Sequence, residues 1–133
     1  MKVMALDFGA ARTGVAVSDP TGTLARPLCV ILDATSRVGR RRLVELVERE
    51  QVELVVVGMP LTLRGARGDQ AKETQAFVDE LRSAVSVPVE TYDERFTTNL
   101  AQQTPSERDT PEDARAAAHL LSSYLEWSSA ARA

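Results

Sequence analysis

The stretch Val3-Met4-Ala5-Leu6-Asp7-Phe8-Gly9-Ala10-Ala11-Arg12-Thr13-Gly14-Val15-Ala16-Val17-Ser18-Asp19 predicts a strand, a tight turn and a second strand. The first strand is apolar along almost its whole length, which indicates burial on both faces. Asp7 interrupts that strand near its end, where an ionised carboxylate without a partner would be costly. Either Asp7 is hydrogen-bonded as a structural group, or it holds a metal ion at the rim of the sheet.

Length and composition are those of one globular domain spanning residues 1–133. The hydrophobic share of 44% and the charged share of 26% are ordinary for a soluble protein. No apolar run is long enough for a signal peptide or a membrane span, so we expect no membrane partner. The single cysteine, Cys29, cannot form an internal disulfide, which favours a cytoplasmic location.

The charge is unevenly spread along the chain. The net charge is −3, which does not by itself indicate a nucleic-acid binder, yet residues 1–67 carry +3 and residues 68–133 carry −6. A dense basic group consists of Arg37, Arg40, Arg41 and Arg42 in the first half of a predicted helix. Two interpretations stay open: a solvated helix face, or contact with a phosphate backbone away from the chemistry.

The order of predicted elements is that of an α/β fold, with an antiparallel meander followed by parallel crossovers. A third strand is predicted at residues 24–32, where Pro27 favours an edge position. Helices are predicted at residues 37–50, 69–84 and from 111 onward, and further strands at 53–58 and 87–92. Two details of this assignment are that Val38 belongs to the apolar stripe of its helix and that residues 128–133 are a frayed tail.

Acidic residues stand at the predicted ends of two strands and the start of one helix. They are Asp7, the pair Asp93-Glu94, and Asp113, which is the polar end of an otherwise apolar helix stripe. Converging carboxylates repel one another unless cations lie between them, and sites made of carboxylate oxygens favour Mg²⁺ or Mn²⁺. Two such ions about 4 Å apart are a common device for phosphodiester hydrolysis, which needs no nucleophilic side chain.

The loop after the fourth strand also contains candidate ligands for phosphate. Residues 58–68 contain three glycines, and the backbone amides together with Thr62, Arg64 and Arg67 could contact a phosphate group. The spacing does not match the nucleotide-binding P-loop.

Taken together, these motifs resemble the YqgF/RuvX family of pre-16S rRNA nucleases, which are related to Holliday-junction resolvases within the RNase H-like superfamily. The motifs that carry the resemblance are Leu6-Asp7-Phe8-Gly9, the run from Arg12 to Asp19, Val57-Gly58-Met59-Pro60-Leu61 with Gly65, the run from Asp93 to Thr98, and Asp113 with Ala116-Ala117. The resemblance covers nearly the whole chain. It implies a five-stranded mixed sheet flanked by helices.

The resemblance also implies an activity and a set of site residues. The activity is metal-dependent cleavage of structured nucleic acid, most plausibly 5′-end maturation of precursor 16S rRNA, with cleavage of branched DNA as an alternative. Asp7, Glu94 and Asp113 match the acidic positions of the family, and Asp93 is the fallback if the strand register differs by one. The residues matched to polar positions that contact phosphate or orient the acids are Arg12, Arg95 and Thr98.

One departure and two competing functions complete the sequence-based picture. Only fourteen residues separate Thr98 from Asp113, whereas relatives typically have a longer helix and a basic loop there, which bears on substrate grip. The competing functions are a non-catalytic nucleic-acid or transcription-complex module, and an actin-like or sugar-kinase ATPase, which would need a second domain. The sequence is compatible with a monomer or a homodimer.

Overall fold

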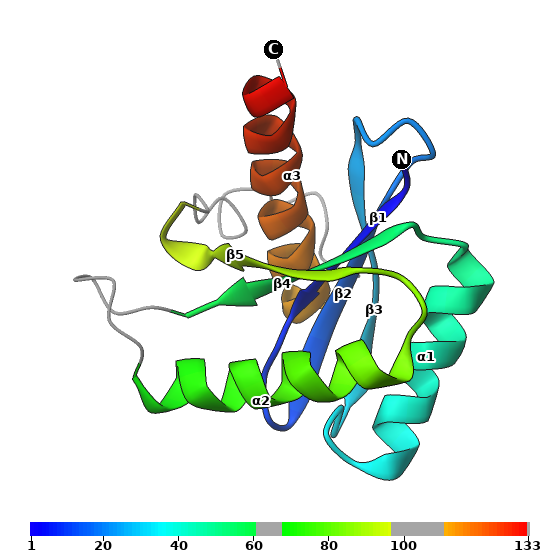
Figure 1. The fold of residues 1–133 in the computed structure, drawn as a ribbon, viewed down its shortest axis with the longest axis vertical. Coiled ribbons are helices and arrows are strands. Elements are labelled where there is room, and N and C mark those ends of the chain that lie inside the picture. The colour runs from blue at the N-terminus through cyan, green and yellow to red at the C-terminus, as the bar shows by residue number, and fades with distance from the viewer. Residues whose placement is uncertain (61–67, 97–110, 133) are drawn as a thin grey trace.

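A five-stranded mixed sheet forms the centre of the computed structural model, which describes residues 1–60, 68–96 and 111–132 (Figure 1). The strands are β1 (Val3–Asp7), β2 (Arg12–Ser18), β3 (Ala25–Leu32), β4 (Leu54–Met59) and β5 (Val89–Asp93). Their order in the sheet is β3-β2-β1-β4-β5. The pairs β1–β2 and β2–β3 are antiparallel, and β1–β4 and β4–β5 are parallel. The predicted meander followed by parallel crossovers is confirmed.

Helices cover both faces of this sheet (Figure 1). Helices α1 (Arg37–Glu50) and α2 (Asp69–Ala84) lie on one face, and α3 (Glu112–Arg132) lies on the other. A short 3₁₀ turn, η1 (Glu94–Phe96), follows β5 directly. Within the described ranges no helix has both the length and the apolar character needed to cross a membrane.

Side chains of the central strand alternate between two hydrophobic clusters. Met4 and Leu6 belong to the cluster under α1 and α2, whereas Val3 and Ala5 belong to the cluster under α3. All four are at most 3% exposed, because a central strand with helices on both faces has no solvent side. Asp7 is therefore the first residue of β1 that leaves the core, at the carboxyl end of the strand.

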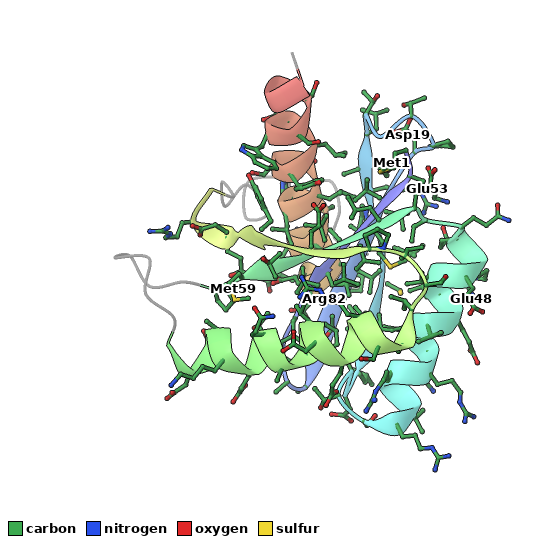
Figure 2. All side chains as sticks on the ribbon, in the orientation of Figure 1. Met1, Asp19, Glu48, Glu53, Met59 and Arg82 are labelled. Carbon is green, nitrogen blue, oxygen red and sulfur yellow. The ribbon has the colours of Figure 1, made fainter. Side chains whose placement is uncertain are left out.

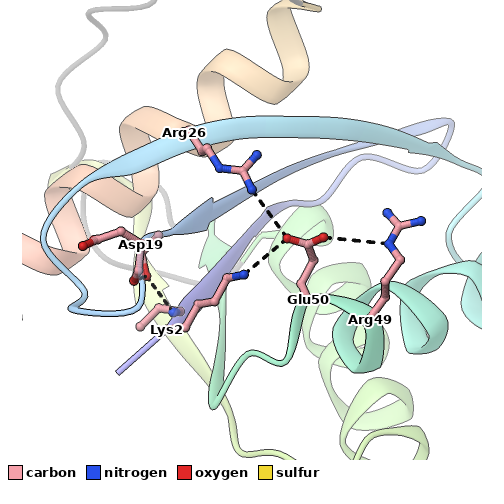
Figure 3. Close-up of polar contacts among 7 residues, drawn as sticks. Lys2, Asp19, Arg26, Arg49 and Glu50 are labelled. Carbon is pink, nitrogen blue, oxygen red and sulfur yellow. Dashed lines mark hydrogen bonds and ion pairs between the residues drawn. The ribbon is translucent and has the colours of Figure 1, made fainter.

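The ends of α1 are fixed by polar contacts. At its beginning Ser36 accepts a hydrogen bond from the backbone amide of Gly39 at 3.0 Å, which is a standard N-cap. Near its end Glu50 forms ion pairs with Lys2, Arg26 and Arg49 at 3.4, 3.6 and 3.8 Å (Figure 3). These contacts join the end of α1 to the start of β1 and to the edge strand β3.

Two details of the sequence-based assignment are wrong. Val38 is 63% exposed, and the buried position of that first helical turn is Gly39, because the buried face of α1 follows Gly39, Leu43, Leu46 and Val47 at helical spacing. The expected frayed tail is instead helical as far as Arg132. The ring centroid of Trp127 lies 5.9 Å from that of Tyr92 on β5, and this contact holds α3 against that strand.

Candidate active site

The carboxyl ends of three parallel strands meet at one edge of the sheet. Asp7 ends β1, Met59 ends β4 and Asp93 ends β5, with Met59 and Asp93 directly paired in the register. Figure 2 labels Met59 at this edge of the sheet. In open α/β sheets this edge is where ligands bind. The sequence-predicted acids therefore come to the edge at which chemistry is expected.

Asp113 reaches this edge because a glycine lies beneath it. Gly14 on β2 is the register partner of Asp7, so the two residues are immediate neighbours across the strands. A methyl group on Gly14 would overlap the backbone carbonyl of Asp113, which means that the first turn of α3 rests directly on this strand. The missing side chain of Gly14 thus lets Asp113 approach the strand end that carries Asp7.

Glu94 reaches the same edge over a second glycine. Gly58 on β4 follows Val57, which is the register partner of Leu6 on β1, so Gly58 lies on the other side of Asp7. A methyl group on Gly58 would lie 2.7 Å from the Oε1 atom of Glu94 and 3.1 Å from a methyl group of Leu120 on α3. Asp7 is consequently flanked by two strands whose glycines each make room for another acid.

The carboxyl groups of Asp7 and Glu94 interact directly. Burial, reinforced by the negative charge of Asp7, raises the pKa of Glu94 to about 7. Burial also raises the pKa of Asp7, and the charge of Asp113 acts in the same direction, whereas the hydrogen bond from Glu94 opposes it. The hydrogen bond between the two groups thus raises the pKa of Glu94 and lowers that of Asp7. This difference corresponds to a protonated Glu94 that donates to the carboxylate of Asp7.

Two arginines hold the neighbouring carboxylates. The Nε atom of Arg12 donates to Oδ2 of Asp113 at 2.7 Å, which joins β2 to the start of α3. Arg95 contacts Asp93 with an Nη2–Oδ2 distance of 2.6 Å, and this hydrogen-bonded partner lowers the pKa of Asp93. Asp93, the fallback position, therefore pairs with Arg95, while its neighbour Glu94 contacts Asp7.

The donor set has the chemistry of a hard-cation site, although no complete ligand cluster is formed. Across residues 1–60, 68–96 and 111–132, no three Asp, Glu, His or Cys side chains converge closely enough to hold a metal ion. Asp7 and Glu94 are in contact. Asp113 lies near enough for its charge to raise the pKa of Asp7, but its carboxylate accepts a hydrogen bond from Arg12. Carboxylate oxygens are the ligands that Mg²⁺ and Mn²⁺ prefer, so the chemistry of these residues fits such an ion although their arrangement does not yet form a complete ligand set.

A small cavity opens beside Asp7 and Glu94, and α2 forms one of its walls. The cavity has a volume of about 240 Å³, and its lining includes Gln70, Glu73 and Thr74 of α2. Thr74 is buried, whereas the sequence pattern predicts no role for Gln70 or Glu73. Gln70 and Glu73 are three residues apart in the first turns of α2, so they lie on the same face of the helix. That spacing is the sequence feature that could have indicated their place beside the site.

The remaining candidate residues and the polar segment before α3 lie outside the described residues. The candidate residues in this group are Thr62, Arg64, Arg67 and Thr98. Residues 97–110, which contain most of the short segment between Thr98 and Asp113, also belong to it. His119, on α3, is partly buried.

Comparison with known proteins identifies the family. Residues 1–127 match the family model RuvX, described as "Holliday junction resolvase". The chain belongs to the RuvX family. This confirms the family resemblance drawn from the acidic and glycine motifs.

Two curated relatives of this RuvX chain carry the same name. A protein of Roseiflexus sp. (strain RS-1), named "Putative pre-16S rRNA nuclease", is 41% identical over 132 residues, which is 94% of each chain. A protein of Chloroflexus aurantiacus (strain ATCC 29366 / DSM 635 / J-10-fl) with the same name is 41% identical over 93% of this chain and 86% of its own length.

Two solved junction resolvases align with nearly the whole chain. Thermus thermophilus RuvC, solved in complex with a Holliday junction substrate, aligns with a TM-score of 0.60 at 22% identity over 96% of both chains. Fowlpox virus resolvase, solved with Holliday junction DNA, aligns with a TM-score of 0.58 at 14% identity over 96% of this chain and 98% of its own. At these identities the alignments establish the shared RNase H-like fold.

Proposed function

We propose that this protein is a nuclease that uses divalent metal ions to hydrolyse phosphodiester bonds in structured nucleic acid. The observation that carries the proposal is the placement of three acids around one strand end. Asp7 contacts Glu94, which packs over Gly58, and Asp113 packs over Gly14 on the strand at the other side. Family membership and the names of the curated relatives support the same activity.

Asp7, Glu94 and Asp113 are the metal ligands in this proposal, and Mg²⁺ or Mn²⁺ is the cofactor. Two such ions would activate the attacking water and stabilise the leaving oxygen of the phosphodiester. Asp7 lies between the two flanking glycine strands and would be a ligand for such an ion. Glu94 must release its proton before it can act as a ligand, because only a carboxylate binds a hard cation effectively.

Arg12 and Arg95 are the described residues placed to contact the phosphate. Arg12 is exposed beside Asp113, and its guanidinium can form paired hydrogen bonds to phosphate oxygens when it leaves that carboxylate. Arg95 is held by Asp93 on the β5 side of Glu94. The two arginines thus flank the three acids on opposite sides of the strand end.

The substrate we propose is precursor 16S rRNA, cleaved near its mature 5′ end. The curated relatives, which match this chain at up to 41% identity, carry that substrate in their name. Four-way DNA junctions are the alternative, favoured by the description of the family model. Junction resolution would require two sites related by a two-fold axis, hence a homodimer, whereas RNA cleavage is compatible with a monomer. A cytoplasmic location fits either substrate.

A direct comparison of the two substrates tests this proposal. Purified protein is incubated with Mn²⁺ or Mg²⁺ and either an RNA spanning the mature 16S 5′ end or a four-way DNA junction, with EDTA as the control. We expect metal-dependent cleavage of the RNA. Cleavage of the junction alone would replace rRNA with branched DNA as the substrate. If neither is cleaved and millimolar Mn²⁺ does not bind, the protein is a non-catalytic binding module.

A further inference from the structure

A shallow basic cavity lies on α1, outside the acidic site. Its lining residues are Arg37, Arg40, Arg41 and Val44, and its volume is about 550 Å³. Arg37 and Arg41 are exposed, and neither forms an ion pair with any described residue. The cavity therefore presents two uncompensated guanidinium groups to solvent.

Arg40 also lines this cavity, but it is already paired with an acid. Its Nη2 atom pairs with Glu80 of α2 at 3.7 Å, but its Nε atom is inaccessible to solvent and has no hydrogen-bond partner within the described part of the chain. That Nε atom is closed to solvent, so the groups that the cavity offers to a ligand are the exposed guanidinium groups of Arg37 and Arg41. Guanidinium groups donate their strongest hydrogen bonds to anions.

The position of these arginines is unfavourable for the helix itself. Arg37 is the first residue of α1, and no acidic residue stands in that first turn, so positive charge accumulates at the positive end of the helix dipole. Arg37 and Arg41 are also four residues apart, a spacing at which like charges repel. A bound anion would offset both effects.

The cavity lies at the same end of the sheet as the three acids. Arg12 at the start of β2 pairs with Leu32 at the end of β3, and the amide of Asp33 donates to the carbonyl of Ala11 at 3.0 Å. Helix α1 begins four residues after Asp33, beside the turn between β1 and β2 (Figure 1). A nucleic-acid strand that contacts Arg12 can therefore continue along the first half of α1.

The geometry points to the cavity of Arg37, Arg40 and Arg41 as a second binding site for the phosphate backbone of the nucleic-acid substrate, remote from the scissile bond. This inference rests on the proposed function, since it assumes that the substrate is a nucleic acid. It also assigns the basic group of α1, which had two interpretations in the sequence, to phosphate contact. The site is independent of base sequence, because guanidinium contacts to backbone phosphates carry no base information.

Binding measured without metal separates this inference from catalysis. The probe is a fluorescein-labelled RNA spanning the mature 16S 5′ end, and anisotropy is recorded in EDTA at several salt concentrations. The test variant is Arg37→Gln/Arg41→Gln. The matched control is Arg26→Gln/Arg49→Gln, which removes the same charge from residues that are already paired with Glu50 (Figure 3).

We expect the test variant to bind on the order of tenfold more weakly at low salt and the control to bind like the wild type. The slope of log K against log salt should become shallower by about 1 to 2, since each lost phosphate contact removes about 0.7 to 0.9. Circular dichroism should report an unchanged fold, because both test residues are exposed. Equal weakening in the two double variants, an unchanged salt slope, or absence of RNA binding by the wild type would overturn the inference. If the wild type fails to cleave RNA but the two double variants still differ in RNA binding, only the nuclease proposal is refuted.

Discussion

Arg12 and Asp113 form an ion pair of 2.7 Å that joins two elements 101 residues apart in the chain. The pair fixes the start of α3 against β2, next to Asp7. It also gives the carboxylate of Asp113 an arginine partner, whereas the carboxyl groups of Asp7 and Glu94 contact each other. In the proposed mechanism, Arg12 and a metal ion compete for Asp113.

Replacing Arg12 should therefore strengthen metal binding while weakening cleavage. In Arg12→Gln the carboxylate of Asp113 is released, and we expect the Kd for Mn²⁺ to fall by up to about fivefold, because an exposed ion pair contributes about 0.2–1 kcal/mol. Cleavage should slow because a phosphate contact is lost. Calorimetric titration with Mn²⁺ and a cleavage assay measure the two effects. Weaker Mn²⁺ binding by the variant would show that Arg12 supports Asp113 rather than competing for it.

The metal-free protein should lose stability as the pH rises toward neutrality. The pKa of Glu94 is 4.5 in the unfolded chain and about 7 in the folded protein, so the folded state binds more protons between these values. Its contribution to stability is complete below about pH 4.5 and is lost as the pH rises through about 7. The raised pKa of Asp7 acts in the same direction. Tm measured in EDTA should fall over this range in the wild type and fall less in Glu94→Gln, and equal pH dependence would contradict the assignment.

The two glycines beside Asp7 should differ in their tolerance of a methyl group. At Gly14 the methyl group meets the backbone of Asp113, which cannot move without displacing α3, so Gly14→Ala should cost about 1–3 kcal/mol or more. At Gly58 the nearest atoms belong to the side chain of Glu94, so Gly58→Ala should displace that carboxylate at a smaller cost in stability. Urea unfolding and Mn²⁺ titration compare them. A more stable Gly14→Ala than Gly58→Ala would refute this packing.

The adjacent acids Asp93 and Glu94 should contribute unequally to activity. Glu94→Gln should lower cleavage by at least about a hundredfold, because even residues that only orient metal ligands cost about 10–100-fold when replaced. Asp93→Asn breaks the contact with Arg95 at the rim and should retain most of the activity. Cleavage rates of the two variants under identical conditions decide between them. A larger loss in Asp93→Asn would restore Asp93 as the ligand.

The sequence predicts the sheet well because its strands and helices carry clear periodic signals. The continuous apolar run before Gly58 indicates a strand buried on both faces, and the structure places it between β1 and β5. Helices α1 and α2 have the bounds that were predicted from their apolar spacing. The prediction for Val38 is wrong because an apolar residue in the first turn of a helix need not face the core, and Gly39 is the buried residue of that turn.

The arrangement of the site depends on contacts that local patterns do not contain. The turn η1 follows β5 at once, and it directs the carboxyl groups of Asp93 and Glu94 to different partners. The pairing of Arg12 with Asp113 and the wall formed by Gln70 and Glu73 arise from packing between distant segments. Such contacts become visible only when the sheet order and the helix positions are known.

Replacement of Asp7 is the most direct test of the proposal that the acids at the end of β1 form a metal-dependent nuclease site. The measurement is Mn²⁺-dependent cleavage of a labelled RNA spanning the mature 16S 5′ end, by the wild type, by Asp7→Asn and by Asp93→Asn as the matched control. The account predicts cleavage by the wild type and by Asp93→Asn, and none by Asp7→Asn that retains the native circular dichroism spectrum. Cleavage by Asp7→Asn at the rate of the wild type would contradict it.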